Sequence, residues 1–146
     1  MIQRLQTVFL FLAFLAFLAI FQFPFAVSDV QSAGFLSDMD YDVFDSAFLL
    51  ALTALGGLTA LIAIFLFKNR TIQLKLSYLI IVFSVLILVV AAVLFYNEAK
   101  NLIHNKGEID DSIALYMPFL SMVFGVLAAR FIGKDEKTVR SMDRLR

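Results

Sequence analysis

Four long runs of apolar residues dominate the pattern along the chain, and short polar connections separate them. The runs cover residues 5–27, 46–67, 76–96 and 113–132, and the only charged residue in them is Arg130, near the end of the fourth. A helix of about 20 mostly apolar residues crosses a hydrocarbon core of about 30 Å. The connections of 18, 8 and 16 residues are too short to form a soluble domain. The pattern therefore predicts an all-α integral membrane four-helix bundle, with residues 1–146 forming a single domain.

Lys and Arg in the connections predict which way the helices cross, because these cations resist translocation. Arg4, the connection 68–75 and the segment from Arg130 to the C-terminus carry ten of the twelve cations. The connections 28–45 and 97–112 carry the other two, together with nine acidic residues. This distribution predicts an N-in/C-in topology of two antiparallel hairpins. The residues from 133 to 146 would form a short basic cytoplasmic tail, and the two acidic connections would lie outside.

The first run has an alternative interpretation as a cleaved signal peptide. Ala26, Val27 and Ser28 offer small residues at a suitable cleavage position. The run is, however, longer than the roughly 7–15 apolar residues of a signal peptide, and Arg4 supplies the only positive charge before it. We therefore favour a retained helix.

Small residues at regular spacing mark candidate contact faces, because in lipid they let helix backbones approach closely. Ser121, Gly125 and Ala129 recur every four residues, Ser77, Ser84 and Ala91 recur every seven, and Gly56 and Gly57 lie in the middle of the second run. We predict that these residues pack helices against one another within the bundle. Contact with a partner membrane protein is the alternative.

The first run repeats Phe-Leu-Ala three times over residues 11–19, which distributes Phe around the helix. A helix with the same chemistry on every side is expected to face lipid. The alternative is a stripe of Phe14, Phe17, Phe21 and Phe25, spaced by three and four, that grips another membrane protein.

The composition leaves little room for catalysis. The chain is 62% hydrophobic, against about 45–50% in soluble domains, and it has no Cys and one His, His104, in a polar connection. The four runs contain no acidic residue, which argues against a proton-coupled transporter. No catalytic motif occurs. We therefore expect no enzyme activity, no cofactor, no metal ligand and, with a net charge of zero, no nucleic-acid partner.

Residues 38–42 begin like a calcium-binding loop, with Asp at alternate positions. Val43 stands where such a loop needs Gly, and Leu49 stands where it needs a bidentate Glu. We predict a solvated acidic connection. A weak site for a divalent cation is the alternative.

Basic residues gather on the predicted cytoplasmic face. The candidate contacts for a partner protein or for anionic lipid headgroups are Lys68, Arg70, Lys75, Lys137, Arg140, Arg144 and Arg146. Val139, Met142 and Leu145 recur every three residues, which predicts a short tail helix with an apolar stripe. The simpler interpretation is positive-inside charge without a specific ligand.

Three stretches carry a resemblance to a known family. They are the opening MIQRLQT at residues 1–7, KNRTIQLKL at residues 68–76, and KDEKTVRSMDRLR at residues 134–146. They are similar to a family of small four-helix bacterial inner-membrane proteins known only as a domain of unknown function. The resemblance spans the chain and implies a location in the bacterial inner membrane. It brings no established activity, so it assigns no role to any residue.

These observations favour a non-catalytic accessory or structural subunit of a larger inner-membrane complex, in protein export or envelope biogenesis. The expected partners are membrane lipid and other inner-membrane proteins, with a homo-oligomer left open. The alternative function is a small transporter or lipid-binding membrane protein for an uncharged or amphipathic ligand. An electrostatic membrane sensor built on the tail is a third hypothesis.

Overall fold

The computed structural model describes residues 3–29, 38–103 and 109–143. Its helices are α1 (Gln3–Ile20), α2 (Ala47–Phe65), α3 (Arg70–Ile103) and α4 (Met117–Asp143), with a short 3-10 helix η1 (Ile113–Leu115). Its strands are β1 (Ala26–Ser28), β2 (Asp40–Tyr41) and β3 (Ile109–Asp111). The chain is therefore mostly helical, as predicted, but it also contains a small sheet that the hydrophobic pattern did not reveal.

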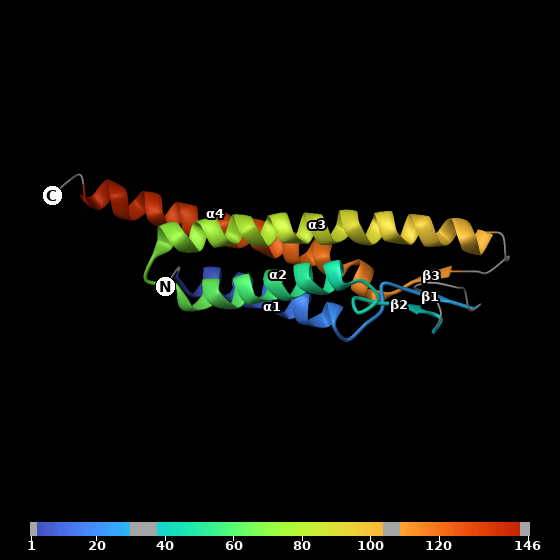
Figure 1. The fold of residues 1–146 in the computed structure, drawn as a ribbon. Coiled ribbons are helices and arrows are strands. Elements are labelled where there is room, and N and C mark those ends of the chain that lie inside the picture. Colours follow the sequence, from blue (N-terminus) through green and yellow to red (C-terminus); the bar gives the residue numbers. More distant parts are fainter. Residues whose placement is uncertain (1–2, 30–37, 104–108, 144–146) are drawn as a thin grey trace.

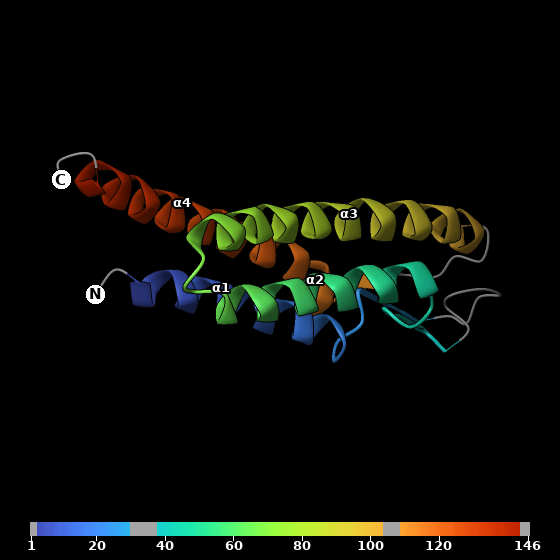
Figure 2. The same ribbon diagram turned by 60° about the vertical axis from the view of Figure 1, so that its left-hand side comes forward.

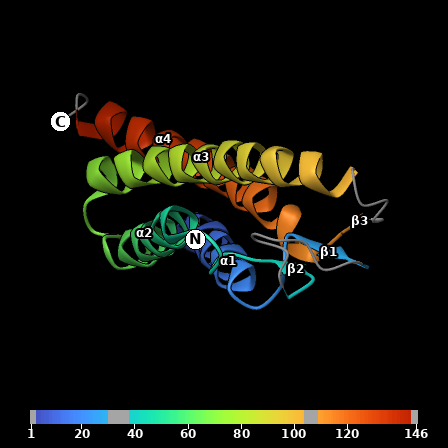
Figure 3. The ribbon, with the colours of Figure 1, turned by 45° about the vertical axis from the view of Figure 1, so that its right-hand side comes forward.

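The four helices form a bundle in which each packs against two neighbours, in the order α1, α2, α3, α4 and back to α1. Figure 1 shows α1 and α2 lying together beneath α3, while α4 slopes down behind α3 towards the sheet, and Figure 3 shows the same arrangement from another side. The start of α1, the end of α4 and the turn between α2 and α3 lie at one end of the bundle in both Figure 1 and Figure 2. The sheet lies at the opposite end.

Three helical segments are long and apolar enough to cross a membrane. They are Ala47–Phe65, Arg70–Asn97 and Ile113–Val139. The apolar part of α1, Leu5–Ile20, is shorter. The chain thus has the helices of a membrane protein, and three of the four expected spans are long and apolar enough to cross a membrane.

Helix α1 ends earlier than the first apolar run, so the predicted span 5–27 is wrong at its C-terminal end. The amides of Phe21, Gln22 and Phe23 close the last turn on the carbonyls of residues 18 and 19. Pro24 follows, and a proline has no backbone N–H to donate and disfavours helical geometry in the residue before it. The chain leaves the helix here and continues into β1.

The three strands form an antiparallel sheet in the order β2, β1, β3. Ala26, in the central strand, pairs with Tyr41 on one side and Asp111 on the other. The amide of Ser112 extends the pairing by donating to the carbonyl of Phe25 at 3.1 Å. The sheet therefore ties both acidic connections to the end of the first apolar run. We call this region, with η1, the sheet end.

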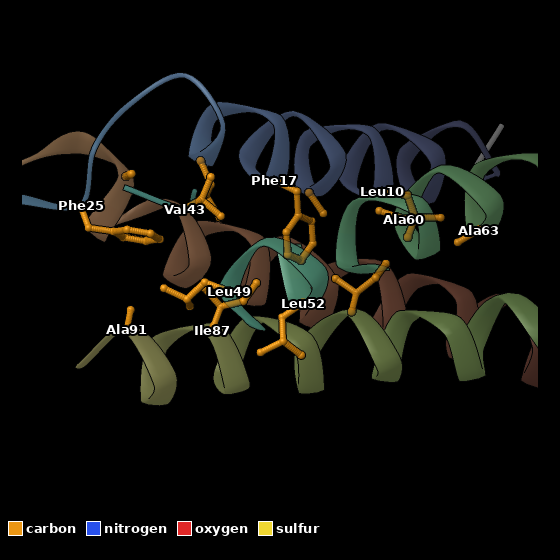
Figure 4. Close-up of a cluster of buried hydrophobic side chains, with 14 of the residues drawn as sticks. Leu10, Phe17, Phe25, Val43, Leu49, Leu52, Ala60, Ala63, Ile87 and Ala91 are labelled. Atoms are coloured by element: carbon orange, nitrogen blue, oxygen red, sulfur yellow. The ribbon is translucent and has the colours of Figure 1, made fainter. Parts of the chain in front are cut away.

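The inner face of α1 is part of the core, which corrects the expectation that its Phe residues face lipid. Phe17 on α1 is buried and Phe14 packs against the same core, as do Phe25, which is buried, and Phe21 just beyond the end of the helix. Figure 4 shows the Phe17 ring pointing from α1 towards α2. The stripe of these four residues therefore packs inside this chain and not on another protein. Phe11 is half exposed on the outer face of α1.

Helix α4 begins and ends differently from the fourth apolar run. Pro118 occupies its first turn, where the missing N–H leaves no hydrogen bond unmade. The helix then passes through Gly133 without a break and continues to Asp143. The basic segment from residue 133, predicted as a short tail with its own helix, is instead the last part of α4 as far as the described residues extend.

Candidate functional site at the basic end

The start of α1, the turn between α2 and α3, and the part of α4 beyond Gly133 lie together at the end of the bundle opposite the sheet (Figure 1). We call this region the basic end. It contains the described parts of the three stretches at residues 1–7, 68–76 and 134–146.

One carboxylate joins three helices at the basic end. Asp135, on α4, forms an ion pair with Arg70, the first residue of α3, with Nε and Oδ2 3.2 Å apart. The same Oδ2 accepts a hydrogen bond from Gln6 Nε2, on α1, at 3.4 Å. The side chains of Arg70 and Asp135 are only 22% and 14% exposed, so this pair is better shielded from water than a surface ion pair. One residue further along, Thr71 Oγ1 donates to Glu136 Oε1 at 3.4 Å.

Two glutamines are buried beside this ion pair. Gln6 is 3% exposed and Gln73 is 1% exposed. Gln73 Nε2 donates to the carbonyl of Ala63 at 3.1 Å, which links α3 to α2. Gln6 Oε1 is buried and has no hydrogen-bond partner within the part of the chain that the structure describes. Most buried polar atoms in proteins are paired, so an unpaired acceptor here needs an explanation.

Two cavities adjoin the glutamines and the ion pair. The first has a volume of about 410 Å³ and is lined by Gln6, Thr7, Val8, Phe11, Ile64, Phe67 and Gln73. The second has a volume of about 670 Å³ and is lined by Phe67, Lys68, Asn69, Arg70, Thr71, Glu136 and Val139. Phe67 borders both. A mostly apolar cavity and a cavity of mixed polar and apolar lining therefore share one aromatic side chain.

The basic residues predicted as partner or headgroup contacts differ in their exposure. Lys68, Lys75 and Lys137 are exposed at the basic end, whereas Arg70 is turned inward to Asp135. The Arg70 guanidinium therefore stabilises the bundle in addition to adding positive charge. Arg140 lies on α4, with its side chain outside the described part, and Arg144 and Arg146 lie outside the described residues.

The structure places all of the predicted helix-packing residues in the buried interior of this chain. They are Gly56, Gly57, Ser77, Ser84, Ala91, Ser121, Gly125 and Ala129. A Cβ atom on Gly56 would lie 2.6 Å from the Phe17 ring, so only a glycine allows α1 and α2 to approach this closely. Ser84 and Ser121 share a hydrogen bond of 2.7 Å between α3 and α4.

Gly125 supports the same contact between α3 and α4. A Cβ atom at this position would lie 3.1 Å from Ile81 Cγ1 and 3.2 Å from Ile80 Cγ2. Ala91 belongs to a different contact, because its carbonyl accepts a hydrogen bond from the Tyr41 hydroxyl at 3.4 Å.

The acidic connection uses its carboxylates to cap its own backbone. Asp45 Oδ2 accepts from the amide of Asp42, and Asp42 Oδ1 accepts from the amide of Phe44, both at 2.7 Å. Partial burial, followed by the nearby Asp residues, raises the pKa of Asp45 above its ordinary value. Among the described residues, no group of three or more acidic or His side chains is placed to hold a metal ion. His104 lies outside the described residues.

The pattern of long apolar runs did not point to Tyr41, which is 1% exposed and central to the sheet end. Its ring packs against Phe25 and Phe95, with centroids 5.7 and 6.1 Å apart. Burial, and to a lesser extent the charge of Asp45, raises the pKa of the Tyr41 phenol. The signal was present, because residues 40–43 alternate polar and apolar and their burial alternates in step.

Sequence reasoning also missed Gln6 and Gln73. Both lie in the stretches that carry the family resemblance, but an uncharged amide at the edge of an apolar run carries no signal of its own burial.

The basic end can be compared with what is known of related sequences. A family model described as Domain of unknown function (DUF4293) matches residues 2–145, which is nearly the whole chain. The chain belongs to the DUF4293 family. This confirms the resemblance to a small family of unknown function. Comparisons with curated proteins and with solved structures found no match.

The description of the DUF4293 family names no activity, so it assigns no role to a residue. The structure adds a spatial relation that the family description does not contain. The three stretches that carry the resemblance, spread along this DUF4293 chain, contribute Gln6, Arg70 and Asp135 to a single linked group of side chains.

Proposed function

We propose that this protein is a non-catalytic accessory or structural subunit of a larger complex in the bacterial inner membrane, in protein export or envelope biogenesis. It crosses the membrane four times, with both termini and the basic end in the cytoplasm, and binds its partner through that end. The observation that carries the proposal is the linkage of Gln6, Arg70 and Asp135, which holds three distant stretches in one arrangement. Lys68, Lys75 and Lys137 are exposed at the same end of the bundle.

The packing of the interior supports a subunit more than a conduit. The Phe17 ring closes against Gly56 between α1 and α2, and the bond between Ser84 and Ser121 closes α3 against α4. A solute passing between these helices would have to open contacts that are buried and close-packed. A small protein with such an interior is suited to present its surfaces to another protein.

The test is co-purification of the full chain, tagged through a flexible linker and expressed at its native level. We expect a stoichiometric membrane partner to be recovered in mild detergent and identified by mass spectrometry. The double variant Arg144→Ala with Arg146→Ala should reduce that recovery at least several-fold. The matched control is Lys100→Ala with Lys106→Ala, which removes the same charge from the other predicted side of the membrane. Recovery of the protein alone, as a monomer or homo-oligomer, would contradict the proposal.

A second candidate function is binding of an amphipathic ligand, as a small transporter or lipid-binding protein. It is supported by the two cavities that share Phe67, one mostly apolar and one of mixed polar and apolar lining. Ligand-dependent shifts in thermal stability, or flux in reconstituted vesicles, would favour this function over the first.

A further inference from the structure

The cavity of about 410 Å³ is an apolar groove on the flank of the bundle. Val8 and Phe11 from α1 and Ile64 from α2 line it, together with Phe67 just beyond the end of α2. Val8 and Phe11 are about half exposed, so the groove opens outward and not into the core. Its walls belong mainly to the apolar segments Leu5–Ile20 and Ala47–Phe65. In a membrane such a groove faces hydrocarbon chains.

A second cavity lies next to the groove, on the other side of Phe67. Beyond Phe67 lies the cavity of about 670 Å³, where Lys68, Asn69 and Thr71 are exposed. Arg70 also lines this cavity, held by Asp135, and Glu136 contributes a carboxylate on its α4 side. The lysine ammonium and the neighbouring polar groups suit a phosphate, and an apolar chain attached to that phosphate would reach the groove past Phe67.

We propose that the two adjoining cavities form a binding site for one phospholipid with an anionic headgroup. An acyl chain lies in the groove beside Val8, Phe11 and Ile64, and the phosphate lies against Lys68. This inference goes beyond the proposed docking of a protein and does not depend on it. It makes more specific the second candidate function, because it names the chemical class of the amphipathic ligand.

Gln6 gives an independent reason to expect an occupant. It lines the groove, it is 3% exposed, and its Oε1 has no hydrogen-bond partner among the described residues. A buried acceptor without a hydrogen bond lowers the stability of a fold by about 1–3 kcal/mol unless a ligand or water pairs with it. A water molecule held between the Gln6 amide and the ester carbonyls of a bound lipid supplies the missing donor for this atom.

The occupant is a lipid and not a partner helix because of the charge and the position of the site. The groove lies at the ends of the apolar segments of α1 and α2, which is the predicted membrane boundary, and it shares Phe67 with a cavity where the Lys68 ammonium is exposed. An anionic phospholipid joins an apolar chain to a negative charge over that same boundary. The lipid is present wherever the protein is inserted.

The experiment uses the absence of Trp from the chain, so that one introduced Trp is the only such fluorophore. Phe67→Trp places the reporter between the two cavities. Phe65→Trp is the matched control, because Phe65 is an exposed Phe two residues away that borders neither cavity. Each protein is reconstituted in phosphatidylcholine vesicles that contain an equal mole fraction of brominated phosphatidylglycerol or of brominated phosphatidylcholine. Bromine quenches Trp fluorescence on contact, which reports the lipid next to the reporter.

We expect brominated phosphatidylglycerol to associate at Phe67→Trp about five times more strongly than brominated phosphatidylcholine. This ratio corresponds to the attraction of one lysine at a membrane surface for an anionic lipid. At Phe65→Trp the ratio should be close to one. Lys68→Ala, added to Phe67→Trp, should bring the ratio down to the control value. Lys75→Ala should leave it unchanged, because Lys75 is an exposed lysine of the same end that borders neither cavity.

Three results would overturn the proposal. Equal ratios at the two Trp positions would show that no selective site exists. Equal effects of Lys68→Ala and Lys75→Ala would show a diffuse attraction to the whole basic end. A Phe67→Trp reporter that neither brominated lipid quenches, while Phe65→Trp is quenched, would show that a protein segment covers the groove.

Discussion

At the basic end, side chains from three helices meet on one carboxylate, whereas at the sheet end the chain closes through backbone pairing of three short strands. Asp135 pairs with Arg70 at 3.2 Å and accepts from Gln6 at 3.4 Å. In the sheet, the amide of Phe25 donates to the carbonyl of Tyr41 at 2.6 Å. The side chains that fill in beneath that pairing are mainly apolar and aromatic.

The difference teaches where the chemical identity of a side chain matters. A backbone hydrogen bond forms with almost any residue, so the acidic side chains that project from the strands can change without loss of the sheet. The group formed by Gln6, Arg70 and Asp135 requires a carboxylate, a guanidinium and a donor in matching places. The basic end is therefore the part of this molecule in which single exchanges of polar residues should have the largest effects.

The largest effect is expected from Asp135→Ala at the basic end. This change leaves the poorly exposed Arg70 charge and the Gln6 donor without their acceptor. Removing one member of a fully buried ion pair costs about 3–5 kcal/mol, and the residual exposure of this pair reduces the expected loss to about 2–3 kcal/mol of unfolding free energy. Thermal and denaturant unfolding in detergent micelles measure the loss.

The control for Asp135→Ala is Asp40→Ala at the sheet end. Asp40 is an exposed carboxylate on β2, so its removal should change the unfolding free energy by less than about 0.5 kcal/mol. Similar losses from Asp135→Ala and Asp40→Ala would contradict the contrast between the two ends.

Midway between the ends, Gly56→Ala and Gly57→Ala form a pair that tests how firmly α1 and α2 hold both ends together. A Cβ at position 56 would lie 2.6 Å from the fully buried Phe17 ring, whereas at position 57 the nearest Phe17 atom would be 3.5 Å away. We expect Gly56→Ala to destabilise by about 2 kcal/mol through overpacking. Gly57→Ala should be neutral or stabilising by up to about 1 kcal/mol, because Ala is the better helix former.

Hydrogen exchange on the Gly56→Ala variant shows whether the ends are coupled. If the bundle opens as one unit, amides at the basic end and the sheet end should both lose protection. Loss confined to one end would show that the two ends unfold separately, and equal stabilities of the two Gly variants would contradict the close approach of Phe17.

Tyr41→Phe is expected to have a smaller effect at the sheet end, and its sign depends on pH. At neutral pH the variant loses one hydrogen bond to Ala91, which costs about 1 kcal/mol. The phenol has a reference pKa of 10.0, and burial raises that pKa in the folded protein. Above pH 10, the unfolded chain therefore releases a proton that the folded chain retains, and the wild type loses about 1.4 kcal/mol of stability per pH unit relative to the variant.

The difference in unfolding free energy between Tyr41→Phe and the wild type should consequently fall to zero at about pH 11 and then change sign. Comparing the two proteins at each pH cancels the titration of the lysines. A difference that stays constant between pH 9 and about pH 11 would show that the Tyr41 phenol ionises as readily in the fold as in the unfolded chain.

Most of the helical fold was predictable because a membrane helix leaves a long signal in composition. The sheet was not, since strands of two and three residues leave almost no periodic pattern and take their partners from distant connections. The inner face of α1 was also hidden. Its Phe-Leu-Ala repeats give all faces of the helix a similar composition. The Phe17 ring points inward because Gly56 has no side chain to occupy the same space.

The candidate site was predictable only as a region. Counting cations placed the three stretches on the same side, and the structure brings them to the same end of the bundle. The partner of Arg70 could not be predicted, because Asp135 is 65 positions away in the sequence. A count of charges on one side of the membrane does not show which residues form ion pairs. Gln6 and Gln73 gave no signal because burial of an amide depends on which helices surround it.

Gln6→Leu should have the smallest effect on stability, and its direction separates a structural role from a functional one. The change removes a hydrogen bond of 3.4 Å to Asp135, which still retains its ion pair with Arg70. It also removes the buried, unpaired Oε1. These two effects oppose each other, so the unfolding free energy should stay within about 1 kcal/mol of the wild type and tend upward. A loss of 2 kcal/mol or more would mean that Gln6 is needed to hold α1 against α4. A stable fold with weaker lipid quenching at Phe67→Trp would instead show that the amide is kept for its ligand, at the expense of stability.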